Sequence, residues 1–511
     1  MRSIRNSSAL LVLVLVVLMI GAGVAFMQRA RRTHSSATVE GSTIKLDRNG
    51  DLQRALNDAK PGDTIVLEAG AVYTGPFTLP VKDGNAYITI QTSRVAELPD
   101  GVRVSPAQTA LFAKLQVAEN GFPIIKTEPA AHHYKFIGVE ISSANDKIKV
   151  SDLVRLGDST PQRTEESVPH HLVIDRSYIH GFPAQEVQRG ISLNSSDTDI
   201  TNSYISDIHG KGYDTQAICG WNGPGRYKII NNYLEGSGEN VMFGGSNPSI
   251  RGLVPTEIEI RDNYFFKPLS WKQGDPSFAG NHWSVKNLFE LKNARKVKID
   301  RNIFENNWVD AQAGSAILFT VRNDEGGAPW STIEDVEFTN NIVKNSPSAV
   351  NLLGKDNLKP SQRASKILIS NNFFTAISGT FLTMSGYPNA TISNNTHFQS
   401  GNIMTLHGDP SPGFVYERNI TVRESNGYGV KGDASGEGTV ALNLFTPNGS
   451  FVNNVIVGAN ASLYPGNNAY PSSLADIGFE NPQKGDFRLN SHSRYRQSGA
   501  DFSRLPTDTK K

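Results

Sequence analysis

Cysteine is almost absent from this chain, and neither sign of charge predominates. One cysteine, Cys219, occurs in 511 residues, so a disulfide framework and a cysteine-ligated zinc site are both excluded. Lysine and arginine number 50 and aspartate and glutamate 49, which gives a formal net charge of +1. A nearly neutral chain lacks the excess of positive charge that binds nucleic acid independently of sequence, and we expect no nucleic-acid partner.

Several motifs of well-defined chemistry are also missing. The sequence has no HExxH zinc motif, no phosphate-binding P-loop and no GxSxG nucleophile elbow. Glycine and proline, with 46 and 26 residues, fall far below the levels of collagen or low-complexity chains. Hydrophobic residues make up 38% of the chain, which is enough for a large core and excludes general disorder.

Long apolar stretches are absent except near the N-terminus. Residues 9–26 carry no charge, Arg2 and Arg5 precede them, and three arginines follow closely. This pattern predicts that residues 1–32 are either a secretory signal peptide or an uncleaved membrane anchor, and the sequence does not decide between them. In either case we expect the folded part, after a linker at residues 33–42, to be extracytoplasmic, either secreted or anchored to the membrane.

A short unit recurs through most of the chain. An apolar residue is followed by polar residues, commonly a pair of asparagines, and then by an aromatic or β-branched residue, as in Ile369-Ser-Asn-Asn-Phe373. Successive units lie 23 to 39 residues apart. Their last residues are Tyr178, Tyr204, Tyr233, Tyr264, Ile303, Ile342, Phe373, Thr396, Ile420 and Val455.

These units are typical of a chain that coils, with each turn stacked on the one before. Asparagine tolerates left-handed backbone angles, which suits a corner, and stacked asparagine side chains can bond one another between turns. A β-propeller or a β-sandwich is the alternative, but adjacent asparagines do not suit its hairpins. We therefore predict an all-β, single-stranded parallel β-helix, a solenoid, over residues 43–490, followed by a polar and loose tail at residues 491–511.

The start of the solenoid carries the clearest helical pattern. Between Asp51 and Lys60 the apolar residues follow the spacing of one helix face, and Pro61-Gly62 ends the pattern. A short helix at this place would cap the open end of the coil, which otherwise exposes strand edges and core.

The opening and closing segments, with the asparagine units between them, resemble one family. The segments Asp51-Leu-Gln-Arg-Ala-Leu56 and Pro61-Gly-Asp-Thr-Ile-Val-Leu67 are similar to the opening of the pectate-lyase-like superfamily of right-handed parallel β-helix proteins. Asn481-Pro-Gln-Lys-Gly-Asp-Phe-Arg-Leu489 resembles a closing segment found in many of them. The resemblance spans residues 43–490 and implies a right-handed coil. It leaves the activity open, because that superfamily includes lyases, hydrolases, epimerases and non-enzymatic adhesins.

Tryptophan is concentrated in one part of the solenoid. All five tryptophans lie between Trp221 and Trp330, where the repeat units are farthest apart and the predicted loops are largest. Because tryptophan faces stack on sugar rings, we predict a substrate-binding role for four of them. The alternative is that the rings pin the long loops to the coil. The four are Trp271, Trp283, Trp308 and Trp330.

Charged residues recur on one face of two successive strands. Glu290 and Lys292 share a face, and one turn later Thr320 and Arg322 take the same places. Adjacent parallel strands lie ~4.8 Å apart, so these side chains would stand together outside the coil. Glu239 lies one or two turns earlier and is followed by two glycines that would leave the surface open. The alternative is a surface ladder of ion pairs.

This set of side chains suits β-elimination on a uronate polymer. The reaction needs a cation for the sugar carboxylate, a base for the C5 proton and help for the leaving oxygen. We predict Lys292 or Arg322 as the base, because neighbouring cations or burial can lower the pKa of such a group. We predict Glu290 and Glu239 as ligands of the substrate or of Ca²⁺. The resemblance implies the same, since lyases of that superfamily use such a basic residue, often with Ca²⁺.

The sequence also departs from the superfamily that it resembles. It lacks the Trp-x-Asp-His motif of the best-known pectate lyases and the Asn-Thr-Asp, Asp-Asp and Gly-His-Gly set of polygalacturonases. Three functions therefore stay open. A polysaccharide lyase is favoured, a non-catalytic carbohydrate-binding or adhesion protein is the first alternative, and a glycoside hydrolase is the second. We expect a monomer, with a membrane contact only through the N-terminal segment if it is uncleaved.

Overall fold

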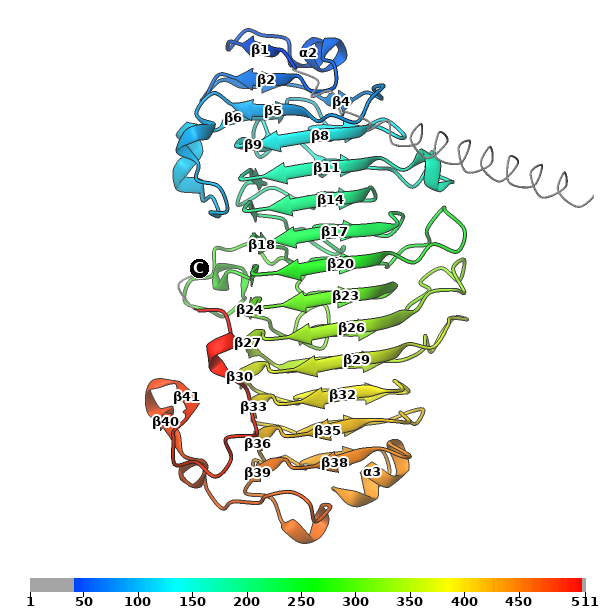
Figure 1. Cartoon of the computed structure of the whole chain (residues 1–511), viewed down its shortest axis with the longest axis vertical. Helices are drawn as coiled ribbons and strands as arrows, with labels where there is room; N and C mark the ends of the chain where they lie inside the picture. The colour runs from blue at the N-terminus through cyan, green and yellow to red at the C-terminus, as the bar shows by residue number, and fades with distance from the viewer. Residues whose placement is uncertain (1–40, 426, 508–511) are drawn as a thin grey trace, which may run out of the picture. The chain divides into compact units, whose positions relative to one another are not determined.

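Nearly all strands of the protein belong to three parallel sheets, which we name A, B and C (Figure 1). The computed structural model describes residues 41–425 and 427–507, and the apolar run at residues 9–26 lies outside them. The chain visits the sheets in a fixed order, A then B then C, so strands three places apart in the sequence pair with each other. This is a parallel β-helix. No helix of the described residues is long and apolar enough to cross a membrane.

The elements have the following bounds within the described residues. Sheet A contains β1 (Thr43–Leu46), β2 (Thr64–Leu67), β5 (Ile88–Thr92), β8 (His132–Ile137), β11 (His170–Asp175), β14 (Ser196–Thr201), β17 (Gly225–Ile230), β20 (Thr256–Arg261), β23 (Ala294–Asp300), β26 (Ile333–Thr339), β29 (Ser365–Ser370), β32 (Ala390–Ser393), β35 (Val415–Glu417) and β38 (Ser450–Val452). Sheet B contains β3 (Val72–Thr74), β6 (Ala113–Val117), β9 (Val139–Ser143), β12 (Tyr178–His180), β15 (Tyr204–Ser206), β18 (Tyr233–Glu235), β21 (Tyr264–Phe266), β24 (Ile303–Glu305), β27 (Ile342–Ser346), β30 (Phe373–Ile377), β33 (Thr396–Gln399), β36 (Ile420–Val422) and β39 (Val455–Val457). Sheet C contains β4 (Phe77–Leu79), β7 (Ile125–Thr127), β10 (Val150–Leu156), β13 (Val187–Leu193), β16 (Gln216–Gly220), β19 (Glu239–Phe243), β22 (Asn287–Leu291), β25 (Ser315–Thr320), β28 (Ser348–Leu353), β31 (Leu382–Ser385), β34 (Met404–Leu406) and β37 (Val430–Gly432). A small antiparallel pair, β40 (Phe479–Asn481) and β41 (Asp486–Leu489), and the α-helices α2 (Leu52–Asp58) and α3 (Thr439–Phe445) follow, and eight short 3-10 helices lie in the connections of the described chain.

Alternate residues of the strands point into the space between the three sheets. In β11, Leu172 and Ile174 are buried, whereas Val173 between them is partly exposed. One continuous cluster of buried apolar residues runs from Leu52 near the start of the solenoid to Tyr464 near its end. Each turn therefore contributes a layer to a single core and packs mainly on the turns above and below it.

The two asparagines at the corner between sheets A and B have different roles. The first takes a left-handed backbone conformation, with φ of +57° at Asn231. The second is buried and bonds to the adjacent turns. The Oδ1 of Asn302 accepts the backbone N–H and the side-chain N–H of Asn263, both at 3.0 Å. Asn302 in turn donates its backbone N–H at 2.8 Å and its Nδ2 at 3.0 Å to the Oδ1 of Asn341.

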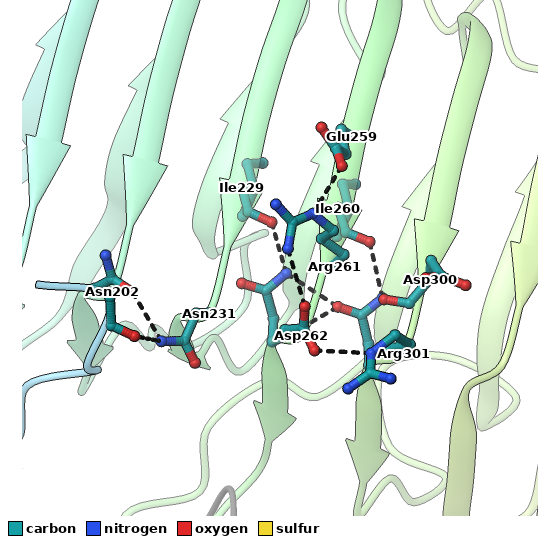
Figure 2. A network of polar contacts seen from close by, with 12 residues as sticks. Asn202, Ile229, Asn231, Glu259, Ile260, Arg261, Asp262, Asp300 and Arg301 are labelled. Atoms are coloured by element: carbon teal, nitrogen blue, oxygen red, sulfur yellow. Dashed lines mark hydrogen bonds and ion pairs between the residues drawn. The ribbon is translucent and has the colours of Figure 1, made fainter. Parts of the chain in front are cut away.

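We call this stack the asparagine ladder. It confirms the prediction that asparagine side chains bond one another between turns. Figure 2 shows the surface of the same corner, where Asp262 stands between Arg261 and Arg301, with both cation-to-carboxylate distances at 3.1 Å. The ladder consists of Asn232, Asn263, Asn302, Asn341, Asn372, Asn395, Asn419, Asn454 and Asn468.

A helix lies where the sequence predicts one near the start of the solenoid. The side chain of Asp51 accepts the backbone N–H of Arg54 at 2.9 Å and so begins α2. Three residues of one face, Leu52, Ala55 and Leu56, are buried and join the core.

The C-terminal tail, which we predicted to be loose, is bound to the solenoid in its described part, up to residue 507. The backbone of Asp501 exchanges two hydrogen bonds with the side chain of Asn371, at 2.6 and 3.3 Å, and the N–H of Gly499 donates to the carbonyl of Arg418 at 2.7 Å. In Figure 1 this red segment runs beside β30 and β33. Its polar composition suggested contact with solvent, but the polar corner of the solenoid supplies partners instead.

Replacing Asn302 with alanine should destabilise the fold, because groups on Asn263, Asn341 and Ile260 lose their buried hydrogen-bond partner. An unsatisfied buried polar group costs about 1–3 kcal/mol, and several are created, so the free energy of unfolding should fall by at least about 2 kcal/mol. Urea unfolding followed by circular dichroism measures the change.

Arg301→Asn is the matched control, one residue earlier. Asparagine adopts the φ of +57° at this position at least as easily as arginine. The ion pair that is lost is partly exposed, with the Arg301 side chain 41% exposed, and contributes roughly 0–1 kcal/mol. If both variants lose the same stability, the ladder does not have the role assigned to it.

Candidate functional site

The outward face of sheet C carries polar side chains in columns. Gln216, Glu239 and Asn287 pair in register on β16, β19 and β22, so each stands beside the next. Met242 and Glu290 belong to a second column on the same face. The face is flanked on one side by the connections from sheet B to sheet C and on the other by those from sheet C to sheet A.

Glu239 is completely buried on this face. Its Oε2 accepts the side-chain N–H of Gln216 at 2.8 Å, whereas its Oε1 has no hydrogen-bond partner among the described residues. The Nζ of Lys286 is 3.9 Å from that oxygen and also forms an ion pair with Asp214. Burial, together with the charges of Glu290 and Asp214, raises the pKa of Glu239 to about 7. Such a strongly shifted carboxyl group is characteristic of functional sites.

Glu290 is the second carboxylate of the face, and it is only 2% exposed. It accepts hydrogen bonds from Asn287 at 3.1 Å and from the hydroxyl of Thr320 at 3.3 Å, one turn later. No cation in the described part of the chain lies within ion-pair distance of it. Two buried carboxylates therefore share this face, with Lys286 3.9 Å from Glu239 and Lys292 interacting with both through its charge.

Lys292 and Arg322 lie on adjacent turns, where the chain leaves sheet C for sheet A. The backbone N–H of Arg322 donates to the carbonyl of Lys292 at 3.1 Å. The stem of Lys292 passes over the two glycines, because a Cβ at Gly244 would be 3.0 Å from the Cβ of Lys292 and one at Gly245 would be 3.3 Å from its Cδ. These glycines leave room for the lysine rather than an open surface, which corrects the expectation from the sequence.

Acidic groups surround both predicted catalytic cations. The Nζ of Lys292 is 3.6 Å from Asp324. Burial alone would lower the pKa of Lys292, but the charges of four carboxylates, of which Glu290 and Asp324 act most strongly, outweigh it and raise the pKa above that of ordinary lysine. The lowered pKa on which a role as base depends is therefore not found for Lys292. Arg322 donates to Asn357 at 2.5 Å and lies 3.4 Å from Asp356.

Three of the tryptophans predicted to bind sugar are buried. Trp271, Trp283 and Trp308 are 5%, 1% and 8% exposed and pack together with Val285. Trp283 also stacks on His209, with the ring centroids 3.9 Å apart. The cluster lies in the connections from sheet B to sheet C, so it fastens the long loops, which was the alternative that the sequence left open. Their burial argues against stacking on a sugar.

Trp330 differs from the other three. It lies in the connection from sheet C to sheet A that also holds Arg322, and it is partly exposed. Its indole N–H donates to the carbonyl of Leu253 at 3.0 Å, which fixes the ring against the connection that precedes β20. Of the four predicted tryptophans, it offers the most surface to a ligand.

Sequence reasoning missed a buried lysine that supports the site. Lys267 is completely buried, and its Nζ donates to the carbonyl groups of Ser237 and Gly238 at 2.9 and 3.1 Å and to the Oδ1 of Asn240 at 3.1 Å. Burial lowers its pKa to about 7, while the charges of Glu239 and Glu235 act in the opposite direction. Lys267 thus holds the turn that carries Glu239. It follows two phenylalanines in the sequence, and nothing local indicates its role.

Three buried oxygens of this face have no hydrogen-bond partner among the described residues. They are the Oε1 of Gln216, the Oε1 of Glu239 and the Oδ1 of Asn287, from three register neighbours. The carboxylate of Glu290 adjoins them through its hydrogen bond to Asn287. Carboxylate and amide oxygens are the donor atoms that Ca²⁺ prefers, so these residues have the donor chemistry of a calcium site. The sequence suggested the two glutamates but not the two amides.

Comparison with known proteins gives the fold. The sequence matches no protein-family model and no curated protein. The structure of the PL6 family alginate lyase AlyGC aligns with a TM-score of 0.51 and 12% identity, covering 92% of this chain and 58% of that one. The catalytic unit of the thermostable GH87 α-1,3-glucanase from Streptomyces thermodiastaticus strain HF3-3 aligns with a TM-score of 0.51 and 11% identity, covering 86% of this chain and 71% of that one. The chain thus spans less than two thirds of AlyGC, and it shares the right-handed parallel β-helix fold with both proteins, as the sequence resemblance implies.

The raised pKa of Glu239 predicts how stability depends on pH. An acid whose pKa is higher in the folded state than its unfolded value of about 4.3 binds more protons when folded, so it costs stability as the pH rises through about 7. Glu239→Gln removes this cost. Relative to the unmodified protein, the variant should gain roughly 1–3 kcal/mol in free energy of unfolding between pH 5 and pH 8. Urea unfolding of both proteins at each pH, in the presence of a calcium chelator, measures this difference in free energy of unfolding.

Glu257→Gln provides the control, because Glu257 is exposed and its carboxylate lies 3.6 Å from Lys296. Its stability relative to the unmodified protein should change little over the same range. A constant difference for Glu239→Gln from pH 5 to pH 8 would contradict the raised pKa.

Proposed function

We propose that the protein is a polysaccharide lyase that cleaves an acidic, uronate-containing polymer by β-elimination at the outward face of sheet C. The observation that carries the proposal is the pairing of Lys292 and Arg322 on adjacent turns, close to the buried carboxylates of Glu239 and Glu290. The fold is shared with an alginate lyase and a glucanase, which supports a polysaccharide substrate but does not choose the reaction.

The two cations suit the steps of β-elimination. A base removes the C5 proton of the uronate, the C4–O bond breaks, a C4–C5 double bond forms, and the leaving oxygen takes up a proton. Arg322 has a planar guanidinium group with several N–H donors, so it suits the sugar carboxylate and the charge that develops on it. Lys292 is the neighbouring group that can exchange a proton.

The charge balance around Lys292 decides whether it can act as the base. Glu239 and Glu290 supply two of the four negative charges that raise its pKa. When a cation compensates these two, burial gains weight and favours the neutral amine. A calcium ion would supply this compensation and help to neutralise the sugar carboxylate. We propose Glu239 and Glu290 as its ligands, with Gln216 and Asn287 completing the set of oxygens.

A pocket on the outer side of sheet B favours glycoside hydrolysis as a second candidate. The pocket measures about 300 Å³ and is lined by Asp207, Glu235 and Tyr204, and by edges of the tryptophan cluster. Burial raises the pKa of Glu235 to about 8, which keeps the carboxyl group protonated at neutral pH, as a general acid requires. The backbone N–H of Asp207 donates to Glu235 at 3.2 Å, so the two acids are neighbours.

Lys292→Ala and Arg322→Ala should each abolish the formation of unsaturated product from an acidic polysaccharide. Loss of a proton-transfer or charge-stabilising group typically costs about 10²–10⁴ in rate. The assay follows the ultraviolet absorbance of the product on a panel of polyuronates and glycosaminoglycans, with and without Ca²⁺. Lys298→Ala and Arg295→Ala, which remove exposed cations from sheet A, are the matched controls and should retain full activity.

Three other results would change the proposal. Activity that survives both substitutions would keep the lyase but remove this site. Reducing ends released without unsaturated product, and lost in Glu235→Gln, would favour hydrolysis at the sheet B pocket. Binding of a polymer without either product would favour the non-catalytic carbohydrate-binding protein.

Calcium should bind to the unmodified protein and raise its thermal unfolding midpoint, because a ligand that binds only the folded state stabilises it. Glu239→Gln and Glu290→Gln should each weaken this binding at least about tenfold, since each removes a charged ligand. Isothermal titration calorimetry measures the affinity, and Glu257→Gln is again the control. Lyase activity that is unchanged in a chelator would reject the calcium site while leaving the cation pair in place.

A further inference from the structure

Four histidines come together at the start of two neighbouring strands of sheet A. His132 and His133 begin β8, and His170 and His171 begin β11. The register pairs His132 with His170, so the second dipeptide lies directly on the first. This group is separate from the charged face of sheet C, and the proposed lyase reaction does not use it.

The four imidazoles form a compact cluster. His132 stacks on His170 with ring centroids 4.9 Å apart and an interplanar angle of 11°, and His133 stacks on His171 at 4.5 Å and 12°. Within each dipeptide the two Nδ1 atoms are 2.8 and 2.7 Å apart. One ring nitrogen from each of His133, His170 and His171 lies within 4.8 Å of the other two.

Among the described residues, the ring of Tyr87 also meets that of His133 edge to face, with the centroids 5.2 Å apart. Within this part of the chain, the hydrogen bonds of the four imidazoles run only between the two members of each dipeptide. Asp197 lies on the next turn, but Arg226 holds its carboxylate with two hydrogen bonds, of 2.5 and 2.6 Å. His133 is 9% exposed, whereas His170 and His171 are partly exposed, so an ion can reach the cluster from solvent.

We propose that His133, His170 and His171, with His132 as a fourth donor, bind a divalent transition metal ion such as Zn²⁺, Cu²⁺ or Ni²⁺. Imidazole nitrogens suit these ions, whereas Ca²⁺ and Mg²⁺ prefer oxygen. Zn–N bonds of about 2.0–2.1 Å place tetrahedral ligand atoms roughly 3.3 Å apart. This separation lies between the 2.7 Å that joins the two Nδ1 atoms of His170 and His171 and the 4.8 Å within which the three ring nitrogens lie. Small ring rotations would therefore assemble the site. The ion would join two turns of the solenoid near its N-terminal end.

The test uses the full chain, purified without a histidine tag and stripped with a chelator. Zn²⁺ is titrated by calorimetry with Ca²⁺ in excess, and Cu²⁺ is added for electron paramagnetic resonance. We expect one ion per chain and nitrogen hyperfine splitting from several imidazoles. The substitutions His170→Ala and His171→Ala together should abolish both signals. His492→Ala removes an exposed histidine elsewhere and should change neither.

A more conservative pair, His170→Asn with His171→Asn, keeps polar side chains and separates loss of ligands from loss of folding, which circular dichroism checks. Metal binding that persists unchanged in folded double variants would overturn the proposal, and so would the absence of Zn²⁺ and Cu²⁺ binding by the unmodified protein. Neither result affects the lyase proposal, because the unsaturated product is measured independently.

Discussion

The buried asparagine ladder is the constraint on which the rest of this structure depends. Each of its side chains satisfies backbone and side-chain groups of the neighbouring turn, as Asn302 does for Asn263. A turn that slipped by one residue would leave these groups unsatisfied and turn core residues outward, so the ladder holds the register. The same register places Gln216, Glu239 and Asn287 in one column on sheet C. The alignment of these three side chains in the candidate site thus depends on hydrogen bonds at another corner of the coil.

Much of this fold could be predicted because its determinants are local and repeated. In each Asn-Asn unit the first residue tolerates a left-handed φ and the second stacks on the equivalent asparagine of the next turn. The structure of the corner can therefore be predicted from the residue types alone. Burial of the loops is different, because it depends on what a segment meets after folding. Trp283 in a long loop is equally consistent with a sugar platform and with packing on His209, and only the tertiary contact decides. The role of Lys267 likewise depends on carbonyl groups about 30 residues away.

Two columns of charge on this solenoid show why spacing alone could not define the site. At the start of the strands of sheet A, charges alternate from turn to turn, and Asp197 with Arg226, Glu257 with Lys296, and Asp335 with Lys366 form ion pairs. These pairs are largely exposed and compensate one another, so they have the properties of a structural ladder. On sheet C the carboxylates of Glu239 and Glu290 are buried, and the nearest cation to Glu239 is 3.9 Å away. Burial distinguishes these two acids from those of the ladder, and the sequence alone does not show which acids become buried.

The carboxylates on this face also account for the raised pKa of Lys292. Its pKa is set by two opposing effects: burial, which favours the neutral amine, and four surrounding carboxylates, which favour the ammonium. The protein retains two buried acids whose mutual repulsion is costly, although a hydrophobic replacement would remove the cost. Such an arrangement is understandable where the acids bind something that the chain itself does not supply. A cation that compensates Glu239 and Glu290 would relieve their repulsion and, through the same charges, bring Lys292 closer to the neutral form. The orphaned oxygens of Gln216 and Asn287 beside these acids are the physical reason to favour an oxygen-liganded ion over a permanently strained surface.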